Sequence, residues 1–275
     1  MNEQIVVAVD GSEASQAAVD WAATDARRRG RTLKVVHVCE QVATAETEYC
    51  EKALAAAVDR ARVILPESEI ASALMPGHPV ETLVAESARA DSIVLGSRGL
   101  GGFAGLVVGS VSLLVAGHAT GPVVVVRGTD PVEHGEVVLG FDGSRPAQAA
   151  AEYAFEQARA RGARLRAVYA WQAPPASPYA VGYGGYVASV FKTETAAMRE
   201  ALTPWREKYQ DIQVIDDEVC DHPVSALIKA SRTADLVVVG SRGLGGFASA
   251  VLGSVSHGVL HHVEGPVAVV RPRKG

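Results

Sequence analysis

The chain has 275 residues, of which 48% are hydrophobic, 21% charged and 5% aromatic, and its formal net charge is −5. This length suits two domains of ordinary size. No apolar run approaches the ~20 residues that cross a bilayer, and the first residues lack the basic and apolar regions of a signal peptide. We therefore expect a cytoplasmic protein that does not bind membranes.

Charge and cysteine content exclude further classes of protein. Residues 1–130 carry 11 basic and 16 acidic side chains, and residues 131–275 carry 15 of each. Neither part therefore has the basic excess of a nucleic-acid-binding protein. Cys39, Cys50 and Cys220 form an odd set without a CxxC motif. That pattern argues against a disulfide framework and against a zinc site.

The first half of the chain alternates short apolar runs with segments of helical periodicity. Strands are expected at 5–9, 32–38, 70–75, 92–95 and 123–126. Helices are expected after Ser12, over about 45–64 and 80–90, and from 110 to about 118. Such alternation favours a parallel sheet with helices on both of its faces.

The second half repeats the same order. Asp142 matches Asp10, and His222 matches His78. The separation between the two histidines is larger than that between the two aspartates, because the second copy contains an insertion between Asp142 and His222. The insertion lies in a loop rich in Pro, Gly and Tyr at 172–186. Its part from 174 to 186 is a candidate lid or partner surface for the second site. We expect a first domain at 1–128, a linker at 129–135 and a second domain at 136–275.

A glycine-rich segment occurs in both halves. The sequence GSRGLGGFA at 96–104 recurs unchanged at 240–248, and each copy is completed by GSVS, at 109–112 and 253–256. The pattern G-x2-G-x9-G-S thus appears twice, each time between an expected strand and an expected helix. Glycines let a backbone approach a phosphate closely, and a helix N-terminus supplies N–H donors and a favourable dipole. The pattern predicts a phosphate-binding loop in each half.

This doubled pattern resembles the nucleotide-binding signature of the universal stress protein family, and nearly the whole chain is similar to a tandem member. The resemblance implies an α/β fold of two doubly wound, parallel, five-stranded sheets with strand order 3-2-1-4-5, as in the adenine nucleotide alpha hydrolases. Such folds bind ligands at the carboxyl ends of the strands, where the order switches direction. The resemblance also implies that the domains pair internally through their last strands, at 123–126 and 267–270, and it leaves room for a homodimer of chains.

The resemblance assigns the binding residues by position. Asp10 and Asp142 match the acidic residue that lies against the nucleoside, and Val38 and Ala170 match the position whose backbone reads the adenine. The loop and helix start that would hold the ribose and phosphates comprise Gly96, Gly99, Gly109, Ser110, Val111 and Ser112 in the first half, and Gly240, Gly243, Gly253, Ser254, Val255 and Ser256 in the second. Since Trp171 replaces Cys39 beside the adenine position, the two pockets are expected to differ.

Each assignment has a structural alternative. The glycines can simply serve tight turns, and Asp10 and Asp142 can cap the turns that follow them. Ser110 and Ser254 can act as helix N-caps, a role that is compatible with phosphate contact.

Other polar residues carry weaker signals. Arg98 and Arg242 can meet phosphate or lie in solvent. His257 and His261 are four residues apart on an expected helix, but no third metal ligand stands at a suitable spacing. The histidines before proline, His78 and His222, are interpreted as turn residues.

The motifs favour a binding protein over an enzyme. The chain lacks G-x4-G-K-[ST], a kinase-type glycine loop with its lysine, and G-x-S-x-G, so no catalytic residue and no metal ligand is assigned. We expect each domain to bind ATP, with or without Mg2+, with little or no hydrolysis. The resemblance implies a regulator of bacterial stress response or growth arrest with an unidentified protein partner. The alternatives are a slow Mg2+-dependent ATPase that uses Asp10 and Asp142, and an interaction scaffold with vestigial nucleotide sites.

Overall fold

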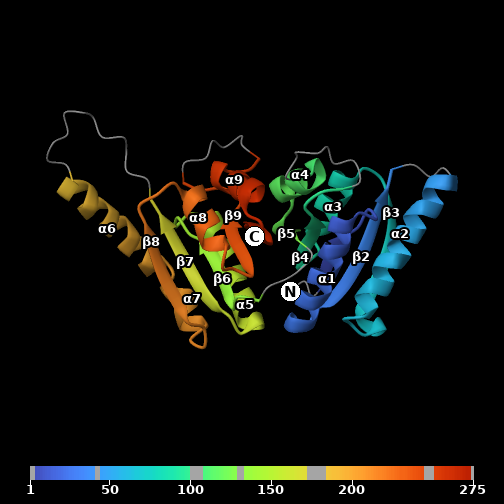
Figure 1. Cartoon of the computed structure of the whole chain (residues 1–275), viewed down its shortest axis with the longest axis horizontal. Coiled ribbons are helices and arrows are strands. Elements are labelled where there is room, and N and C mark those ends of the chain that lie inside the picture. The colour runs from blue at the N-terminus through green and yellow to red at the C-terminus, as the bar shows by residue number, and fades with distance from the viewer. Residues whose placement is uncertain are drawn as a thin grey trace.

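The computed structural model describes residues 4–40, 44–99, 108–128, 133–171, 184–244 and 251–273. In these residues ten strands form one sheet with helices on both faces (Figure 1). The elements of the first half are β1 (Gln4–Ala8), α1 (Glu13–Arg29), β2 (Thr32–Cys39), α2 (Thr44–Arg62), a short 3-10 helix (Glu67–Glu69), β3 (Ile70–Pro76), α3 (Pro79–Ser87), β4 (Ser92–Gly96), α4 (Ser110–His118) and β5 (Gly121–Val126). Those of the second half are β6 (Glu136–Gly140), α5 (Arg145–Arg161), β7 (Arg164–Ala170), α6 (Gly184–Ala201), α7 (Thr203–Lys208), β8 (Val214–Val219), α8 (Pro223–Ser231), β9 (Leu236–Gly240), α9 (Ser254–His262) and β10 (Val267–Arg271).

The strand order confirms the predicted topology of each half. Across the sheet it is β3-β2-β1-β4-β5-β10-β9-β6-β7-β8, which is 3-2-1-4-5 in the first half and the same order, reversed in space, in the second. Neighbouring strands within each half are parallel. β5 and β10 pair antiparallel, from Val125 opposite Val267 to Gly121 opposite Arg271. The two predicted sheets therefore join into one, through the edge strands predicted to meet.

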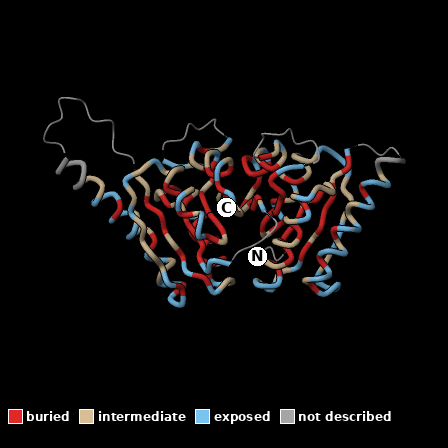
Figure 2. Tube along the Cα trace, viewed as in Figure 1, coloured by how far each residue is buried: buried red, intermediate tan, exposed pale blue. Residues whose placement is uncertain are grey.

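Local sequence explains where the first helix of each half begins and ends. Ser12 and Ser144 act as N-caps and accept hydrogen bonds from the backbone N–H three residues later. Gly30 and Gly162 end the helices in the left-handed conformation, with φ of 59° and 61°, which glycine adopts without a steric cost. Burial follows the sheet: the strands are the most buried part of the molecule (Figure 2).

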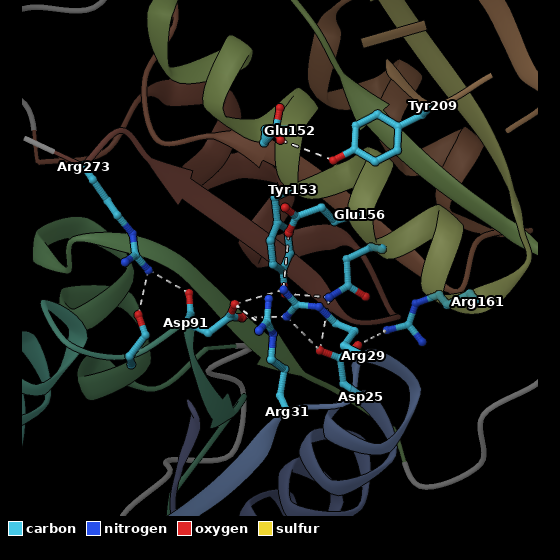
Figure 3. A network of polar contacts seen from close by, with 12 residues as sticks. Asp25, Arg29, Arg31, Asp91, Glu152, Tyr153, Glu156, Arg161, Tyr209 and Arg273 are labelled. Carbon is cyan, nitrogen blue, oxygen red and sulfur yellow. Dashed lines mark hydrogen bonds and ion pairs between the residues drawn. The ribbon is translucent and has the colours of Figure 1, made fainter. Parts of the chain in front are cut away.

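A polar network joins α1 to α5 (Figure 3). Asp25 of α1 is fully buried and lies 3.5 Å from Arg29 of its own helix. From α5, Gln157 donates to Asp25 over 3.1 Å and Arg161 over 3.3 Å. In the repeat, Arg29 corresponds to Arg161, and Asp25 to Gln157. The second copy has thus kept the arginine and lost the carboxylate, so both arginines share one carboxylate at the centre of the network.

The network extends to the loops at its rim. Arg29 also contacts Asp91 at 2.6 Å and Glu156 of the second domain at 3.3 Å. Arg273, after β10, donates to the carbonyl oxygens of Ala90 and Asp91. Charged side chains from both domains therefore form ion pairs with one another, and most of these side chains are shielded from water.

The helix after the second strand is attached differently in the two domains. In the first, Cys39 at the end of β2 forms a disulfide with Cys50 of α2. The cysteine pattern argued against disulfides, and for this pair the expectation was wrong, because the fold brings the two Cα atoms to 6.5 Å although the spacing in the chain is not a recognisable motif. In the second domain, Trp171 occupies the position of Cys39 and packs against Phe191 of α6, with ring centroids 6.0 Å apart. Residues 174–183 of the predicted lid lie outside the described residues, and residues 184–186, which were expected in the loop, form the start of α6.

His37 in β2 also contributes to the contact between β2 and α2. It is 5% exposed, and within the described part of the chain its Nδ1 has no hydrogen-bond partner. Its ring meets that of Tyr49 edge-on, at 6.4 Å between centroids, and Tyr49 donates to the carbonyl oxygen of Asp10. Burial lowers the pKa of His37, and the Asp10 carboxylate opposes this only in part.

We predict that Asp25→Ala lowers the free energy of unfolding by about 3–5 kcal/mol, because Arg29 and Arg161 lose a buried partner. Asp20→Ala is the matched control on the same helix. Asp20 pairs with Arg60, but the two side chains are 39% and 44% exposed, so the loss should stay below about 1 kcal/mol. Urea denaturation of both variants measures the difference, and equal losses would contradict a stabilising role for the network.

We also predict that the protein loses stability in mild acid through His37. Its folded-state pKa lies below its ordinary value of 6.5, so the unfolded chain binds the proton more readily. The stabilising contribution is complete above about pH 6.5 and declines as the pH falls below it, by at most about 1.4 kcal/mol per pH unit. Urea denaturation between pH 7.5 and 5.5 should show a weaker decline for His37→Asn than for wild type. The exposed His78→Asn serves as control, and identical pH profiles for all three proteins would refute the assignment.

Candidate functional site

The predicted binding residues gather where strands end beside one another. β1 and β4 are neighbours, with Val7 opposite Val94, so Asp10 and the glycine segment that begins at Gly96 leave the sheet at one edge. β6 and β9 do the same in the second domain. Both candidate sites thus stand at the point where the strand order switches direction, and α4 and α9, whose first residues border them, lie along the upper side of Figure 1.

The two aspartates organise the turns that follow the first strand of each domain. Asp10 Oδ1 accepts a hydrogen bond of 3.0 Å from the backbone N–H of Ser12, and Asp142 accepts the same bond from Ser144. The turn-capping alternative is therefore confirmed. This hydrogen bond uses one oxygen of each carboxylate, Oδ1, and does not involve Oδ2.

That second oxygen faces the glycine segment. Asp142 Oδ2 accepts a 3.1 Å hydrogen bond from the backbone N–H of Leu244. A Cβ atom on Gly243 would lie 2.4 Å from this oxygen, and one on Gly99 would lie 2.5 Å from Asp10 Oδ2. A side chain at either position would displace the carboxylate from the glycine segment. In the second domain, Asp142 thus joins the turn after β6 to the glycine segment.

The first glycine of each segment has a packing role. A Cβ atom on Gly96 would lie 2.6 Å from the backbone of Ala14 in α1, and one on Gly240 would lie 2.7 Å from the backbone of Pro146 in α5. These glycines let the first helix of each domain approach the end of the fourth strand. This packing shapes the site, and contact of Gly96 and Gly240 with a ligand stays a prediction.

The buried serines of the two helix starts fasten helix to strand. Ser112 Oγ donates to the carbonyl oxygen of Gly96 over 2.7 Å, and Ser256 Oγ donates to that of Gly240 over 2.9 Å. Each hydroxyl proton is therefore used inside the protein. Sequence reasoning placed both serines at the site, and the structure gives them a positioning role there.

The N-termini of α4 and α9 differ from those of α1 and α5. Their N-caps are Gly109 and Gly253, which provide no side-chain cap for the first turn. The hypothesis that Ser110 and Ser254 are N-caps was wrong, since both are the first residues of their helices, followed by the half-buried Val111 and Val255. Each glycine closes the base of its loop by donating to the carbonyl oxygen of Ser97 or Ser241. A helix end of this kind offers backbone N–H groups and a positive dipole to an anion.

The two positions assigned to the adenine lie on β2 and β7, the strands that pair with β1 and β6. Val38 in β2 is opposite Met75, and Ala170 in β7 is opposite Val219. Both are half-buried and pack on the side of the sheet that α4 or α9 covers. Ala170 has the smaller side chain of the two, so the two sites differ at this position.

Two arginines that the sequence motifs did not single out stand at the base of the loops. Arg127 follows β5, and Arg271 ends β10 in the second copy. Burial and the neighbouring Arg98 lower the pKa of Arg127 to about 10, and burial and Arg242 lower that of Arg271. A pair of guanidinium groups thus lies near each glycine segment. The available signal was the repeat itself, in which Arg271 matches Arg127 as Arg242 matches Arg98.

The remaining candidates are structural. His78 and His222 stand at the N-caps of α3 and α8. The rings of His257 and His261 lie 4.4 Å apart, but the described residues contain no group of three or more side chains that could hold a metal ion. Residues 100–107 and 245–250 of the glycine segments lie outside the described residues. No helix in the described part of the chain is long and apolar enough to cross a membrane.

Known proteins resemble this chain over its full length. The model of the universal stress protein family matches residues 1–127 and again 134–271. A universal stress protein of Mycobacterium tuberculosis is 38% identical over 97% of this chain and 96% of its own length. A second one from that species is 36% identical over 98% and 95%.

A solved structure shows the same fold. A universal stress protein from Archaeoglobus fulgidus superposes with a TM-score of 0.71 at 20% identity and covers 100% of both chains. The double match to one family model agrees with the repeated strand order and with the two equivalent sites. The chain belongs to the universal stress protein family, with one family unit in each half.

Proposed function

We propose that this protein is an ATP-binding regulator in which each domain binds one nucleotide, as ATP or its Mg2+ complex, with little or no hydrolysis. The observation that carries the proposal is the pair of uncapped helix starts at Gly109 and Gly253. Each stands at the end of a glycine segment, at the switch point of its half of the sheet. This is the arrangement in which open α/β sheets hold nucleotide phosphates.

The arginine pairs support an anionic ligand. Arg98 and Arg127 are close enough for one to lower the pKa of the other, as are Arg242 and Arg271. Arg127 and Arg271 donate to carbonyl oxygens across the domain interface, so contact with a phosphate would fall to Arg98 and Arg242. The negative charge of an anion there would relieve the repulsion within each pair. The nucleoside would then extend toward Asp10 and Val38 in the first site, and toward their counterparts in the second.

The arrangement of the aspartates supports binding over catalysis. Asp10 and Asp142 accept backbone N–H groups, and Asp142 does so with both oxygens. A carboxylate engaged in this way holds loops together and is poorly placed to orient a nucleophile. Phosphoryl transfer also needs a cation on the terminal phosphates and bound Mg2+. No lysine lies among the described residues of either glycine segment or of the helix start that follows it.

Membership of the family supports a role in stress. We place the protein in the bacterial cytoplasm, where nucleotide occupancy would alter its shape or its contacts during stress or growth arrest. Its partner would be another protein, and a homodimer of chains is compatible with the internal pairing of the domains. A slow Mg2+-dependent ATPase and a scaffold with empty sites are the competing outcomes of the tests below.

The first test is the nucleotide released when freshly purified protein is denatured, measured by chromatography and mass spectrometry. We expect close to two ATP per chain. One per chain would indicate that the difference between Val38 and Ala170 matters. None, with no binding after ATP and Mg2+ are added, would favour the scaffold.

Variants at the helix starts locate the binding in the same assay. Ser110→Asp and Ser254→Asp each place a carboxylate at the first position of a helix, where negative charge stabilises the helix itself. It would nevertheless repel a nucleotide phosphate, so each variant should lose one of the two equivalents and the double variant both. Ser110→Ala and Ser254→Ala remove no cap and should retain both. Full occupancy of the double aspartate variant would disprove the proposed location.

Hydrolysis should be far slower than the about 1–100 turnovers per second of protein kinases. The reason is that the two aspartates are committed to backbone hydrogen bonds. Phosphate release from ATP and Mg2+ over hours measures it. Many turnovers per minute, lost in Asp10→Asn and Asp142→Asn, would establish an enzyme instead.

A further inference from the structure

Arg271 connects the second glycine segment to the first domain. One of its terminal nitrogens, Nη2, donates to the carbonyl oxygen of Val251, 2.9 Å away, where the second segment runs into α9. The same nitrogen donates to the carbonyl oxygen of Gly117 in α4. A single guanidinium group therefore touches the loop of one candidate site and the helix of the other.

The contact is close because residue 117 is glycine. A Cβ atom at Gly117 would lie 2.3 Å from Val251 Cγ1 and 3.6 Å from Leu252 Cγ. The end of the second glycine segment thus rests directly on the backbone of α4. Any shift of Val251 must be accommodated by this helix or by the loop itself.

α4 is also the helix that begins the first site. Its first residue, Ser110, lies two turns before Gly117, a distance of about 10 Å along a rigid helix. Movement or ordering of one end therefore reaches the other end. Helix α4 therefore contacts both candidate sites, although the sites belong to different domains.

The reciprocal contact is built differently. Arg127 donates to the carbonyl oxygens of Leu260 and Val263 at the end of α9. The counterpart of Gly117 on α9 is His261, which carries a side chain where α4 has none. Among the described residues, the link through Arg271 and Gly117 therefore has no identical counterpart on the other side of the pseudo-symmetric pair.

We propose that Arg271 and Gly117 are positioning residues that couple the two nucleotide sites. This inference rests on the proposed binding of ATP by both domains. A nucleotide phosphate at the start of α9 fixes the position of Val251 and Leu252 and, through Arg271, stabilises α4 in the position that receives phosphate in the first site. Binding energies are reciprocal, so ATP in the first site strengthens binding in the second by the same factor.

The test measures ATP binding to the full chain by calorimetry with Mg2+ present. The affinity of the first site is compared between wild type, where the second site fills, and Ser254→Asp, where it does not. We expect it to be about five-fold or more weaker in Ser254→Asp, the lower range of known couplings. In the Arg271→Gln background, with ATP raised until the second site is filled as in wild type, the same comparison should give a ratio near one.

Two further variants separate coupling from a general weakening of the interface. Gly117→Ala pushes Val251 away without removing a charge and should also bring the ratio near one. Arg273→Gln is the matched control, because Arg273 lies two residues after Arg271 and donates to Ala90 and Asp91 of the first domain. It should leave the ratio at its wild-type value.

The outcomes are distinguishable from those for the proposed function. Two sites that bind ATP independently in wild type would overturn the coupling and leave the proposed function intact. Loss of coupling in Arg273→Gln as well would overturn the positioning role of Arg271. Absence of ATP binding in every protein would refute the proposed function itself, and the coupling with it.

Discussion

Five residue pairs between β5 and β10 turn two valine-rich edge strands into the centre of one sheet. An unpaired apolar edge is an open template for association, and here each domain closes the edge of the other. The pairing also brings α1 against α5 and the end of the second glycine segment against α4. The relation between the two candidate sites is therefore a consequence of how two strands meet.

The contacts around this pairing are asymmetric although the domains are repeats. At the centre of the α1–α5 contact, one carboxylate, Asp25, serves two arginines, and Gln157 stands where its copy would be. Two buried carboxylates at this distance would repel each other and one would take up a proton. Replacing one by an amide keeps a donor for Asp25. Pairing of the two unlike domains thus places a single carboxylate at the centre of the contact.

Much of the fold was predictable from sequence because it depends on local rules that appear twice. The strand runs, the helix start after Ser12 and the regular correspondence between the halves led to the observed strand order. The candidate site followed from the same repeats, since a strand end and a glycine segment recur together in each half. What local patterns could not supply was the direction of individual groups, such as the Ser112 hydroxyl bonded to Gly96, or the open helix start at Gly109 in place of a serine cap.

Long-range partners were also beyond the sequence. Cys39 and Cys50, Asp25 and Arg161, or Arg271 and Gly117 meet only because whole elements have been assembled, and their spacing in the chain carries no periodicity. A contact of this kind depends on the path of every element between its members.

The position of β10 in the chain has a consequence for synthesis. β1 to β5 are complete by residue 126, but the strand that covers β5 comes only at 267–271. A ribosome adds about 5–20 residues per second, so the Val123–Val126 edge waits on the order of ten seconds for its partner. During that interval the nascent first domain carries an uncovered valine strand, and this is the stage at which the protein is most exposed to aggregation and to capture by chaperones.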